Sequence, residues 1–415
     1  MTSIGNVIFY ILIFFTVYIQ VFFFITFLEN RKKLVVRNGK IKLKSYPAVT
    51  IVVPCWDEEK TVYKTVRSLL GLNYPKDKLK IFLIDDGSTD DTLHIIRRFE
   101  KYPNIKVFHK KNGGKYTALN LGLEHVETAF FGCLDADSLA HPESLVRIMS
   151  YFEKDEGVMA VAPSILVHDP KNIVQRAQKV EGDMSVFLKK MLGFLGAIHV
   201  TPGPLTIFRK KVFSDLGPYR HAHNTEDMEI AFRMQKNHYK IDQCNDAYVY
   251  TNVPKTVRKL FRQRLRWIYG FINNTIDYRD VIFRRKYGNF STFTLPVGLL
   301  CIFAVSFTFG KIIYNFANFI SFKIMELKTV GFSLAAKMSD FDAFFINTQS
   351  IMIFIIFLYF FVTLSVVLGR KMAEGRWRVS LNILSFFFIF SFVGPLWLMK
   401  AVYNTIISRR MPSWR

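Results

Sequence analysis

The chain has 415 residues, of which half are hydrophobic and 21% are charged, and its formal net charge is +23. A mean hydropathy of +0.18 with this many charges excludes one uniform soluble globule and predicts a soluble part joined to a membrane part. Four cysteines in no CxxC or CxxH pattern indicate neither a zinc site nor a disulfide framework, which suits a reducing compartment. They are Cys55, Cys133, Cys244 and Cys301.

Residues 7–28 form the first apolar run, in which Gln20 is the only strongly polar residue. The run is long enough to cross a bilayer, which needs roughly 20 residues. It has no basic segment before it and no small-residue cleavage site after it, so residues 1–28 are predicted to be an anchor and not a signal peptide. Seven basic residues follow, opposed only by Glu29, and basic flanks stay in the cytosol. They are Arg31, Lys32, Lys33, Arg37, Lys40, Lys42 and Lys44.

Apolar runs return at 293–316, 351–368 and 381–407, so residues 291–415 are predicted to be a membrane region of about three spans. Basic clusters before the first run and between the last two indicate cytosolic segments, and the charge-balanced loop 321–347 indicates an external one. The clusters are Lys255, Arg258, Lys259, Arg262, Arg264, Arg266, Arg279, Arg284, Arg285 and Lys286, then Arg370, Lys371, Arg376 and Arg378.

The sequence leaves the side of the C-terminal tail open. Strict alternation puts the tail outside, but the Gly394-Pro395 pair in the last run allows that segment to break and re-enter. The pattern predicts a multi-pass protein of the cell (plasma) membrane with residues 29–290 in the cytosol. Because the basic residues flank the membrane runs or belong to a motif described below, no nucleic-acid partner is expected.

Between residues 49 and 162 short apolar runs alternate with segments of helical periodicity. This order predicts an α/β domain with a parallel sheet covered on both faces, and ligands bind at the carboxyl edge of such a sheet. The expected strands are 50–53, 80–85, 105–109 and 129–135, and the expected helices are 58–70, 89–99, 116–126 and 142–152. No GxGxxG follows a strand, which argues against a dehydrogenase-like nucleotide fold, and Asn112-Gly113-Gly114-Lys115 lacks the earlier Gly of a phosphate loop.

Acidic pairs follow the second and fourth expected strands. Asp85 and Asp86 precede a Gly-Ser turn, and Asp135 and Asp137 are spaced so that both can reach one divalent cation bridging a diphosphate. An ordinary turn explains either motif alone. Their shared position at one sheet edge favours a ligand site.

Two further motifs follow. In Thr225-Glu226-Asp227, before a predicted helix over 228–237, Thr225 or Asn224 suits a helix cap and a carboxylate suits removal of a proton from a sugar hydroxyl. Gln263-Arg264-Leu265-Arg266-Trp267 puts two guanidinium groups, which suit a diphosphate, beside an indole, which suits a sugar ring. A snorkelling interfacial helix explains the second motif equally well when it is taken alone.

These four motifs occur in the same order, and with the same spans, as in the processive branch of glycosyltransferase family 2, which the chain resembles over residues 49–267. That branch includes cellulose, chitin, hyaluronan and poly-N-acetylglucosamine synthases and the nodulation chitooligosaccharide synthase. The resemblance implies a GT-A-type α/β fold for the cytosolic domain. It also implies inverting transfer from a UDP-sugar to a growing polysaccharide, coupled to export across the bilayer.

The resemblance assigns a role to each matching residue. Asp227 matches the general base, with Glu226 beside it in the motif. Asp137, assisted by Asp135, matches the residues that hold Mg²⁺ or Mn²⁺. The donor side is assigned Pro54, Glu58, Asp85, Asp86, Lys115, Asp135 and Arg266. The acceptor side is assigned Gly203, Gln263, Arg264 and Trp267.

The match is incomplete at two places. Trp56 and Asp57 stand where the family usually has Tyr or His followed by Asn. The Pro202–Pro204 segment does not have the most familiar sequence of the family's acceptor loop. The sugar is therefore open, with UDP-N-acetylglucosamine preferred because the layout of one span before the domain and three after it is similar to that of the chitooligosaccharide and poly-N-acetylglucosamine enzymes. His221 and His223 are interpreted as polar residues flanking a helix, with metal ligation as the alternative.

Two rival functions remain compatible with the sequence. One is a non-processive transferase that glycosylates a lipid acceptor, and the other is a membrane scaffold with a decayed transferase domain. The intact acidic positions argue against decay. The expected partners are a UDP-sugar, a polysaccharide or oligosaccharide acceptor and the lipid bilayer, with accessory export subunits left open.

Overall fold

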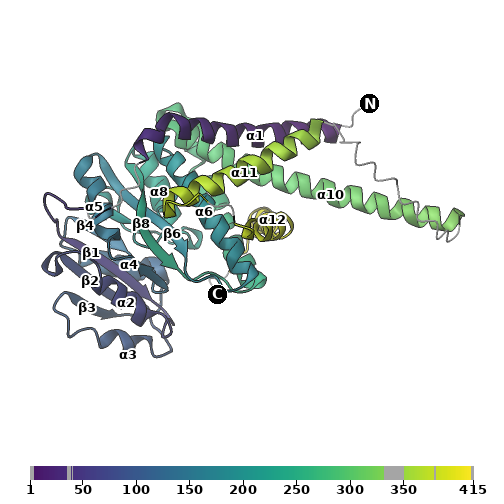
Figure 1. Ribbon diagram of the computed structural model, residues 1–415. Helices are drawn as coiled ribbons and strands as arrows, with labels where there is room; N and C mark the ends of the chain where they lie inside the picture. The colour runs from purple at the N-terminus through teal and green to yellow at the C-terminus, as the bar shows by residue number, and fades with distance from the viewer. Residues whose placement is uncertain (1–3, 35–38, 40, 331–349, 378–379, 413–415) are drawn as a thin grey trace.

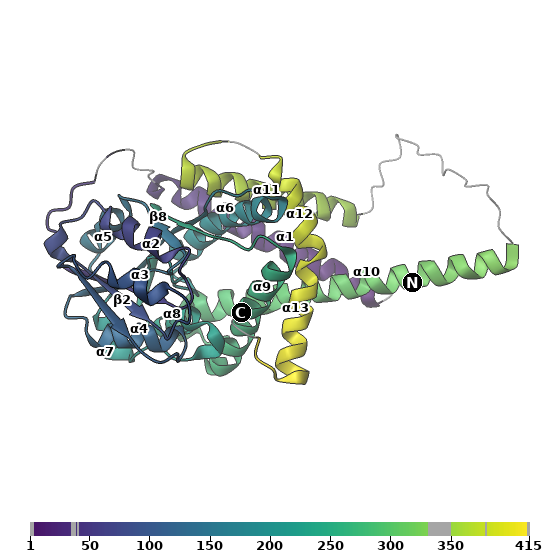
Figure 2. The same cartoon turned by 90° about the horizontal axis from the view of Figure 1, so that it is seen from below.

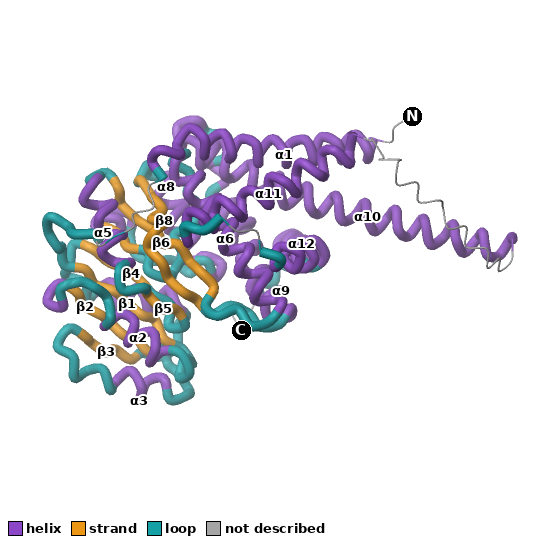
Figure 3. The backbone as a smooth tube through the Cα atoms, in the orientation of Figure 1, coloured by secondary structure: helices purple, strands orange, loops and turns teal. Residues whose placement is uncertain are grey.

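A computed structural model describes residues 4–34, 39, 41–330, 350–377 and 380–412. An α/β domain lies at one end of the molecule, and long helices extend away from it (Figure 1). The tube view separates the layer of strands from these helices (Figure 3). The predicted outside loop lies largely in residues 331–349, outside the described residues, and Arg37, Lys40 and Arg378 also lie outside them.

The domain is built on one eight-stranded sheet in the order β3-β2-β1-β4-β7-β6-β8-β5. The four predicted strands are confirmed, and they form its parallel half, in which β1 pairs with β2 and β4 and β2 pairs with β3. The other half is mixed, because β7 is antiparallel to β4 and β6, β5 is antiparallel to β8, and β6 is parallel to β8. The strands are β1 (Val49–Cys55), β2 (Leu79–Asp85), β3 (Ile105–His109), β4 (Phe130–Cys133), β5 (Ser138–Ala140), β6 (Val158–Val167), β7 (Ile207–Arg209) and β8 (Lys240–Thr251).

Helices cover both faces of the parallel half, as predicted. Ile51 and Val53 of β1 belong to one buried cluster and the intervening Val52 belongs to another, which is the alternation a doubly covered strand requires. The helices of this half are α2 (Val62–Leu70), α3 (Thr92–Arg97), α4 (Lys115–Glu124) and α5 (Ser144–Lys154).

The rest of the domain carries longer helices. The first begins with a capping box, in which the Asn172 side chain accepts from the Gln175 N–H and the Gln175 side chain accepts from the Asn172 N–H. These helices are α6 (Ile173–Phe194), α7 (Lys211–Leu216), α8 (Glu226–Lys236) and α9 (Val257–Asp277). Short 3₁₀ and π segments are η1 (Arg31–Lys33), η2 (Lys76–Lys78), η3 (Ala222–Asn224), η4 (Arg279–Val281), η5 (Arg285–Tyr287), η6 (Phe290–Thr294) and η7 (Asn404–Ser408).

Four helical segments are long and apolar enough to cross a membrane: Ile4–Lys33, Phe290–Thr329, Met352–Glu374 and Asn382–Ser408. Among them, α1 contacts both α10 and α11, and the three run in similar directions (Figures 1 and 2). The helices concerned are α1 (Ile4–Asn30), α10 (Leu295–Val330), α11 (Ser350–Glu374), α12 (Asn382–Phe392) and α13 (Gly394–Tyr403).

The last apolar segment is arranged differently from the other three. Helix α12 is seen end-on in Figure 1 and lengthwise in Figure 2, so it lies across the direction of α1, α10 and α11. The Gly394-Pro395 pair falls where α12 ends and α13 begins. The chain does not turn back there, because α13 continues along α12 (Figure 2).

Candidate functional site

The carboxyl edge of the parallel strands holds the first acidic pair. Asp86 is buried and accepts hydrogen bonds from the Gly113 N–H (3.1 Å), the Gly114 N–H (2.9 Å) and Lys110 Nζ (2.6 Å). The neighbouring Gly87 has φ +71°, which favours glycine. A Cβ at this position would lie only 2.6 Å from the Asn112 backbone nitrogen. Asp86 therefore fixes the glycine loop that leads into α4.

Asp85 is also enclosed by protein. Its carboxylate lies 2.7 Å from His109 Nδ1 and accepts from the Ser88 N–H (3.3 Å). Since both carboxylates of the pair are buried and bonded to the segments around the ends of β2 and β3, they organise the loops at this edge of the sheet.

Two donor-side residues from the β1 end lie at the same edge. Pro54 is in register with Ile84 on β2, and the Glu58 carboxylate accepts from the Thr61 hydroxyl (2.6 Å). The unexpected Asp57 has φ +51° and accepts from the Thr89 N–H (2.8 Å), so it ties the loop after β1 to the loop after β2.

Lys115 joins two motifs that are far apart in the chain. Its ammonium lies 2.6 Å from Asp135 Oδ1 and 3.3 Å from Glu226 Oε1. Burial works against the charge, but Asp135, Glu226 and Asp227 raise the pKa of Lys115 well above its usual value. The Lys115 ammonium at the start of α4 therefore brings together the loop after β4 and the start of α8.

Asp137 lies beside this cluster and suits a metal. Burial and the charges of Asp135 and Glu58 raise its pKa to about 7. In the described part of the chain no three His, Cys, Asp or Glu residues form a complete metal site. Mg²⁺ is commonly held by one or two carboxylates together with substrate phosphates, so the crowded carboxylates fit a cation that arrives with a diphosphate.

The Thr225-Glu226-Asp227 motif opens α8, with Thr225 at the predicted cap position. Thr225 is the N-cap residue and makes no capping bond with its side chain. Its hydroxyl donates to the Ala222 carbonyl (2.9 Å) and accepts from Asn274 of α9 (2.9 Å). The Asp227 carbonyl accepts from both the N–H (3.1 Å) and the hydroxyl (2.8 Å) of Thr201, which leaves its carboxylate free of these contacts.

The environment of Asp227 favours a base that works near neutral pH. Burial and the adjacent Glu226 raise its pKa to about 6, while Lys115 and Arg266 act in the opposite direction. Glu226 is paired with Lys115. Asp227 is consequently the better placed of the two carboxylates to exchange a proton.

Helix α9 is fastened to the segment before α8. Arg266 Nη1 donates to the Asn224 carbonyl (2.7 Å). A Cβ at Gly270 would lie 2.4 Å from Thr225 Cγ2. His223 Nε2 lies 2.8 Å from Asp277 Oδ2. These contacts lie along the second half of α9 and hold Arg266 next to the carboxylates. Burial lowers the pKa of Arg266, and the charges of Glu226, Asp227 and Asp135 oppose that shift.

Arg264, which was predicted on the acceptor side, is buried. Its guanidinium forms an ion pair with Glu181 of α6, donates to Gln263 Oε1 (2.9 Å) and lies 4.1 Å from the centre of the Trp267 ring. A cation–π contact contributes about 0.5 to 2 kcal/mol, depending on how far it is shielded from water. Trp267 is 40% exposed, so Arg264 and Gln263 position an indole face that a sugar could reach.

Gly203 lies close to the Lys115–Asp135 ion pair, and its acceptor role stays a prediction. A Cβ there would lie 2.7 Å from both Asp135 Oδ1 and Lys115 Nζ, so the glycine packs against that ion pair. The Leu205 N–H donates to the Cys133 carbonyl (2.7 Å), which anchors the loop to β4. Gly203 thus shapes the donor side as well as any acceptor surface.

The alternative of histidine ligands is not supported. His221 packs edge-on against Tyr116 at 5.5 Å, and His223 is bonded to Asp277. Neither histidine belongs to a metal cluster within the described residues. Sequence reasoning missed the contacts of Thr201, Asn274 and Glu181, because single polar residues of this kind carry no motif.

Residues 50–217 match the family model described as glycosyl transferase family 2. A poly-beta-1,6-N-acetyl-D-glucosamine synthase of Staphylococcus epidermidis is 29% identical over 251 residues, which is 60% of each chain. The synthase of the same name from Staphylococcus aureus is 26% identical over 266 residues, covering 64% of this chain and 62% of its own. The match thus spans about 60% of the length of these curated relatives.

A similar solved structure is a mannosyltransferase from Pyrobaculum calidifontis in complex with GDP-Man and Mn²⁺. It has a TM-score of 0.58 at 15% identity and covers 96% of this chain and 99% of its own, which shows a shared fold. With these matches, residues 50–217 are a glycosyltransferase family 2 domain, and the chain is similar to the poly-beta-1,6-N-acetyl-D-glucosamine synthases.

Proposed function

We propose that the chain transfers N-acetylglucosamine from UDP-N-acetylglucosamine to a growing polysaccharide. The observation that carries the proposal is the convergence of Lys115, Asp135 and Glu226, with Asp227 and Arg266 beside them, at the carboxyl edge of the sheet. The names of the relatives support the choice of sugar and product.

In the proposed reaction an acceptor hydroxyl attacks the anomeric carbon as its proton passes to Asp227. The new carbon–oxygen bond forms while the bond from that carbon to the β-phosphate oxygen breaks, and UDP leaves with the bonding electrons. Attack from the side opposite UDP inverts the anomeric centre. Arg266 is permanently charged and sits beside the carboxylates, so it can offset the negative charge that develops on UDP.

The donor's diphosphate needs a further positive charge. Mg²⁺ or Mn²⁺, when bound to Asp137 with help from Asp135, would supply Lewis acidity to the leaving diphosphate. The raised pKa of Asp137 supports this placement, because nearby negative charges make its ionised form unfavourable until a cation arrives. The similar mannosyltransferase was solved with Mn²⁺.

We place residues 29–290 in the cytosol, where nucleotide sugars are made, and the apolar helices in the plasma membrane. The basic segment η1 ends the first apolar helix on the side of the catalytic domain, in agreement with the distribution of charge across membranes. In this arrangement the product leaves through or beside the helices, and accessory subunits would assist export.

The proposal is tested by incubating the full chain, in lipid nanodiscs, with a panel of UDP-sugars and GDP-mannose and sizing the product. A ladder or polymer made only from UDP-N-acetylglucosamine is expected. A single glycolipid product would establish the lipid-acceptor function instead. No nucleotide release from any donor would refute transfer.

Activity should depend on pH through Asp227. Its pKa of about 6 lies above the usual value of about 3.9, so the carboxylate that accepts the proton is lost as the pH falls through 6. At low donor concentration kcat/KM should therefore fall about tenfold for each pH unit below that point. UDP release measured between pH 5 and 8, with folding followed in parallel, checks this, and a flat profile would contradict it.

A further inference from the structure

The segment α12–α13–η7 has the length and composition of a membrane span but not the direction of one. Its 27 residues, Asn382–Ser408, would extend about 40 Å at about 1.5 Å per residue, against roughly 30 Å for the hydrocarbon core. Length thus permits a crossing. Figures 1 and 2 show instead that the segment lies across α1, α10 and α11.

Both ends of the segment stay on the catalytic domain. The preceding helix α11 ends at Glu374, which accepts from Lys179 of α6 (2.8 Å), and α12 packs against the same α6. At the other end Asn273 of α9 donates to Thr405 (3.0 Å). A crossing helix would put one of these ends on the far side of the bilayer.

The inner face of the segment is part of the domain's core. Phe386, Ile389 and Trp397 are buried in the cluster that also contains Leu260 of α9, and the Trp397 ring lies 6.4 Å from that of Phe261. The segment therefore packs on the domain along its length, with α12 on α6 and with α13 and η7 on α9.

The outer face carries an exposed apolar stripe, at whose end the Lys400 ammonium lies 4.5 Å from the centre of the Tyr403 ring. Its residues recur every three or four positions and are between 39% and 66% exposed. We call it the outer stripe: Leu384, Phe388, Phe392, Leu396, Met399 and Tyr403.

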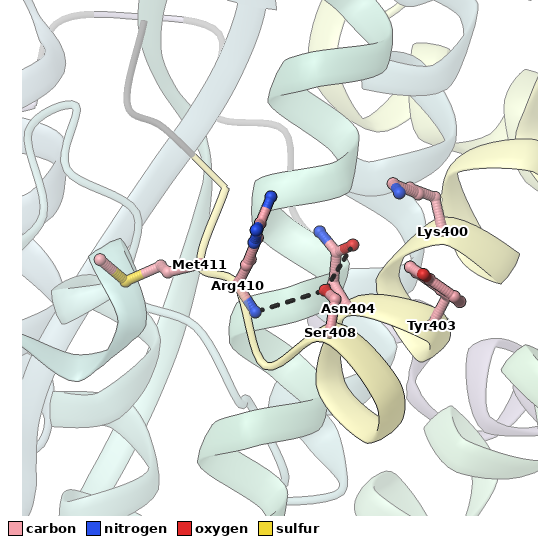
Figure 4. A pocket seen from close by; sticks show the side chains of 6 residues that line it. All are labelled: Lys400, Tyr403, Asn404, Ser408, Arg410 and Met411. Atoms are coloured by element: carbon pink, nitrogen blue, oxygen red, sulfur yellow. Dashed lines mark hydrogen bonds between the residues drawn. The ribbon is translucent and has the colours of Figure 1, made fainter.

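Basic residues gather where the segment ends. Figure 4 shows Lys400 and Tyr403 on α13 and Arg410 just beyond η7, lining one pocket. Arg409 has φ +49°, and the Arg410 N–H donates to Ser408 Oγ (3.4 Å). Basic side chains beside apolar ones suit the headgroup level of the cytosolic leaflet.

We propose that α12–α13 lies in the plane of the bilayer on the side of the catalytic domain, with the outer stripe against lipid. The chain then crosses the membrane three times, through α1, α10 and α11, and its tail returns to the side of the domain. The inference rests on the membrane setting and not on the transferase activity.

Cysteine labelling in sealed vesicles of both orientations tests the side of the tail. In the full chain, Arg410→Cys should react with a membrane-impermeant maleimide in the same vesicles as Glu127→Cys, which is on the domain and 80% exposed. Glu326→Cys, near the far end of α10, should react only in the opposite orientation. The parent chain gives the background. Reaction of Arg410→Cys together with Glu326→Cys would overturn the proposal.

Nitroxide depth measurements test the orientation independently. Labels at Leu384, Phe392 and Met399 should report similar, shallow depths. In a matched series on α10, at Phe303, Ile313 and Phe322, the depth of the label in the bilayer should rise to a maximum and then fall. A maximum at Phe392 would mean that the segment crosses the bilayer, and water-exposed labels throughout would mean that lipid does not cover the stripe. Either result would refute the inference.

Discussion

Replacing Asp227 with Asn is expected to lower kcat by about 10²- to 10⁴-fold, the range for loss of a general base, while UDP still binds. An amide has the shape of the carboxylate but cannot take up the acceptor's proton. The bonds from Thr201 reach the main-chain carbonyl of Asp227, so the substitution leaves them intact. Steady-state turnover and UDP calorimetry measure the two effects separately.

A matched substitution shows whether the loss is specific. Asp280→Asn removes a carboxylate whose ion pair with Lys236 is on the surface, where such pairs contribute little, and it should leave turnover nearly unchanged. If Asp227→Asn retained turnover, or lost UDP binding to the same degree, the assignment of the base would be wrong.

The second large effect is expected at Gly270, a position without chemistry of its own. Gly270→Ala would place a methyl group 2.4 Å from Thr225 Cγ2 and Oγ1, so α9 and the segment before α8 must separate. Arg266 and the carboxylates would move apart with them. Misplacement by about 1 Å can lower a rate about 10²-fold, and we expect a loss of that size in kcat.

Two variants make this expectation specific. Gly310→Ala, in α10 where nothing lies within 4 Å, is the matched control and should behave as the parent chain. The double variant Gly270→Ala/Thr225→Ala removes the two nearest atoms, leaves only the Cβ of residue 225 at 2.9 Å, and should recover part of the lost activity. Full activity in Gly270→Ala alone would show that the close contact is unimportant.

The parallel half of the sheet was predictable because its strands are short apolar runs between helical segments. The other half was not. Strands β5 and β7 have three residues each, too few for a periodic signal. Strand β6 contains Pro163, and β8 mixes charged residues with apolar ones. Their pairing depends on contacts between distant segments, which a local pattern does not carry.

The motifs identified which side chains meet but not how each is used. Their order located the carboxylates and Arg266, and the structure brings these together. Arg264 was expected on the acceptor surface, but in the structure it forms a buried pair with Glu181, 83 positions away. No sequence spacing predicts such a partner, because it arises from the packing of α6 on α9.

Adjacent residues of α9 face in two directions. Asn273 is bonded to Thr405, and Asn274 is bonded to Thr225 beside the proposed base. A chain shortened before Thr405, or one with a bulky fusion immediately behind it, would therefore loosen the support on one side of a helix whose other side shapes the reaction centre. An affinity tag is better placed at the opposite terminus.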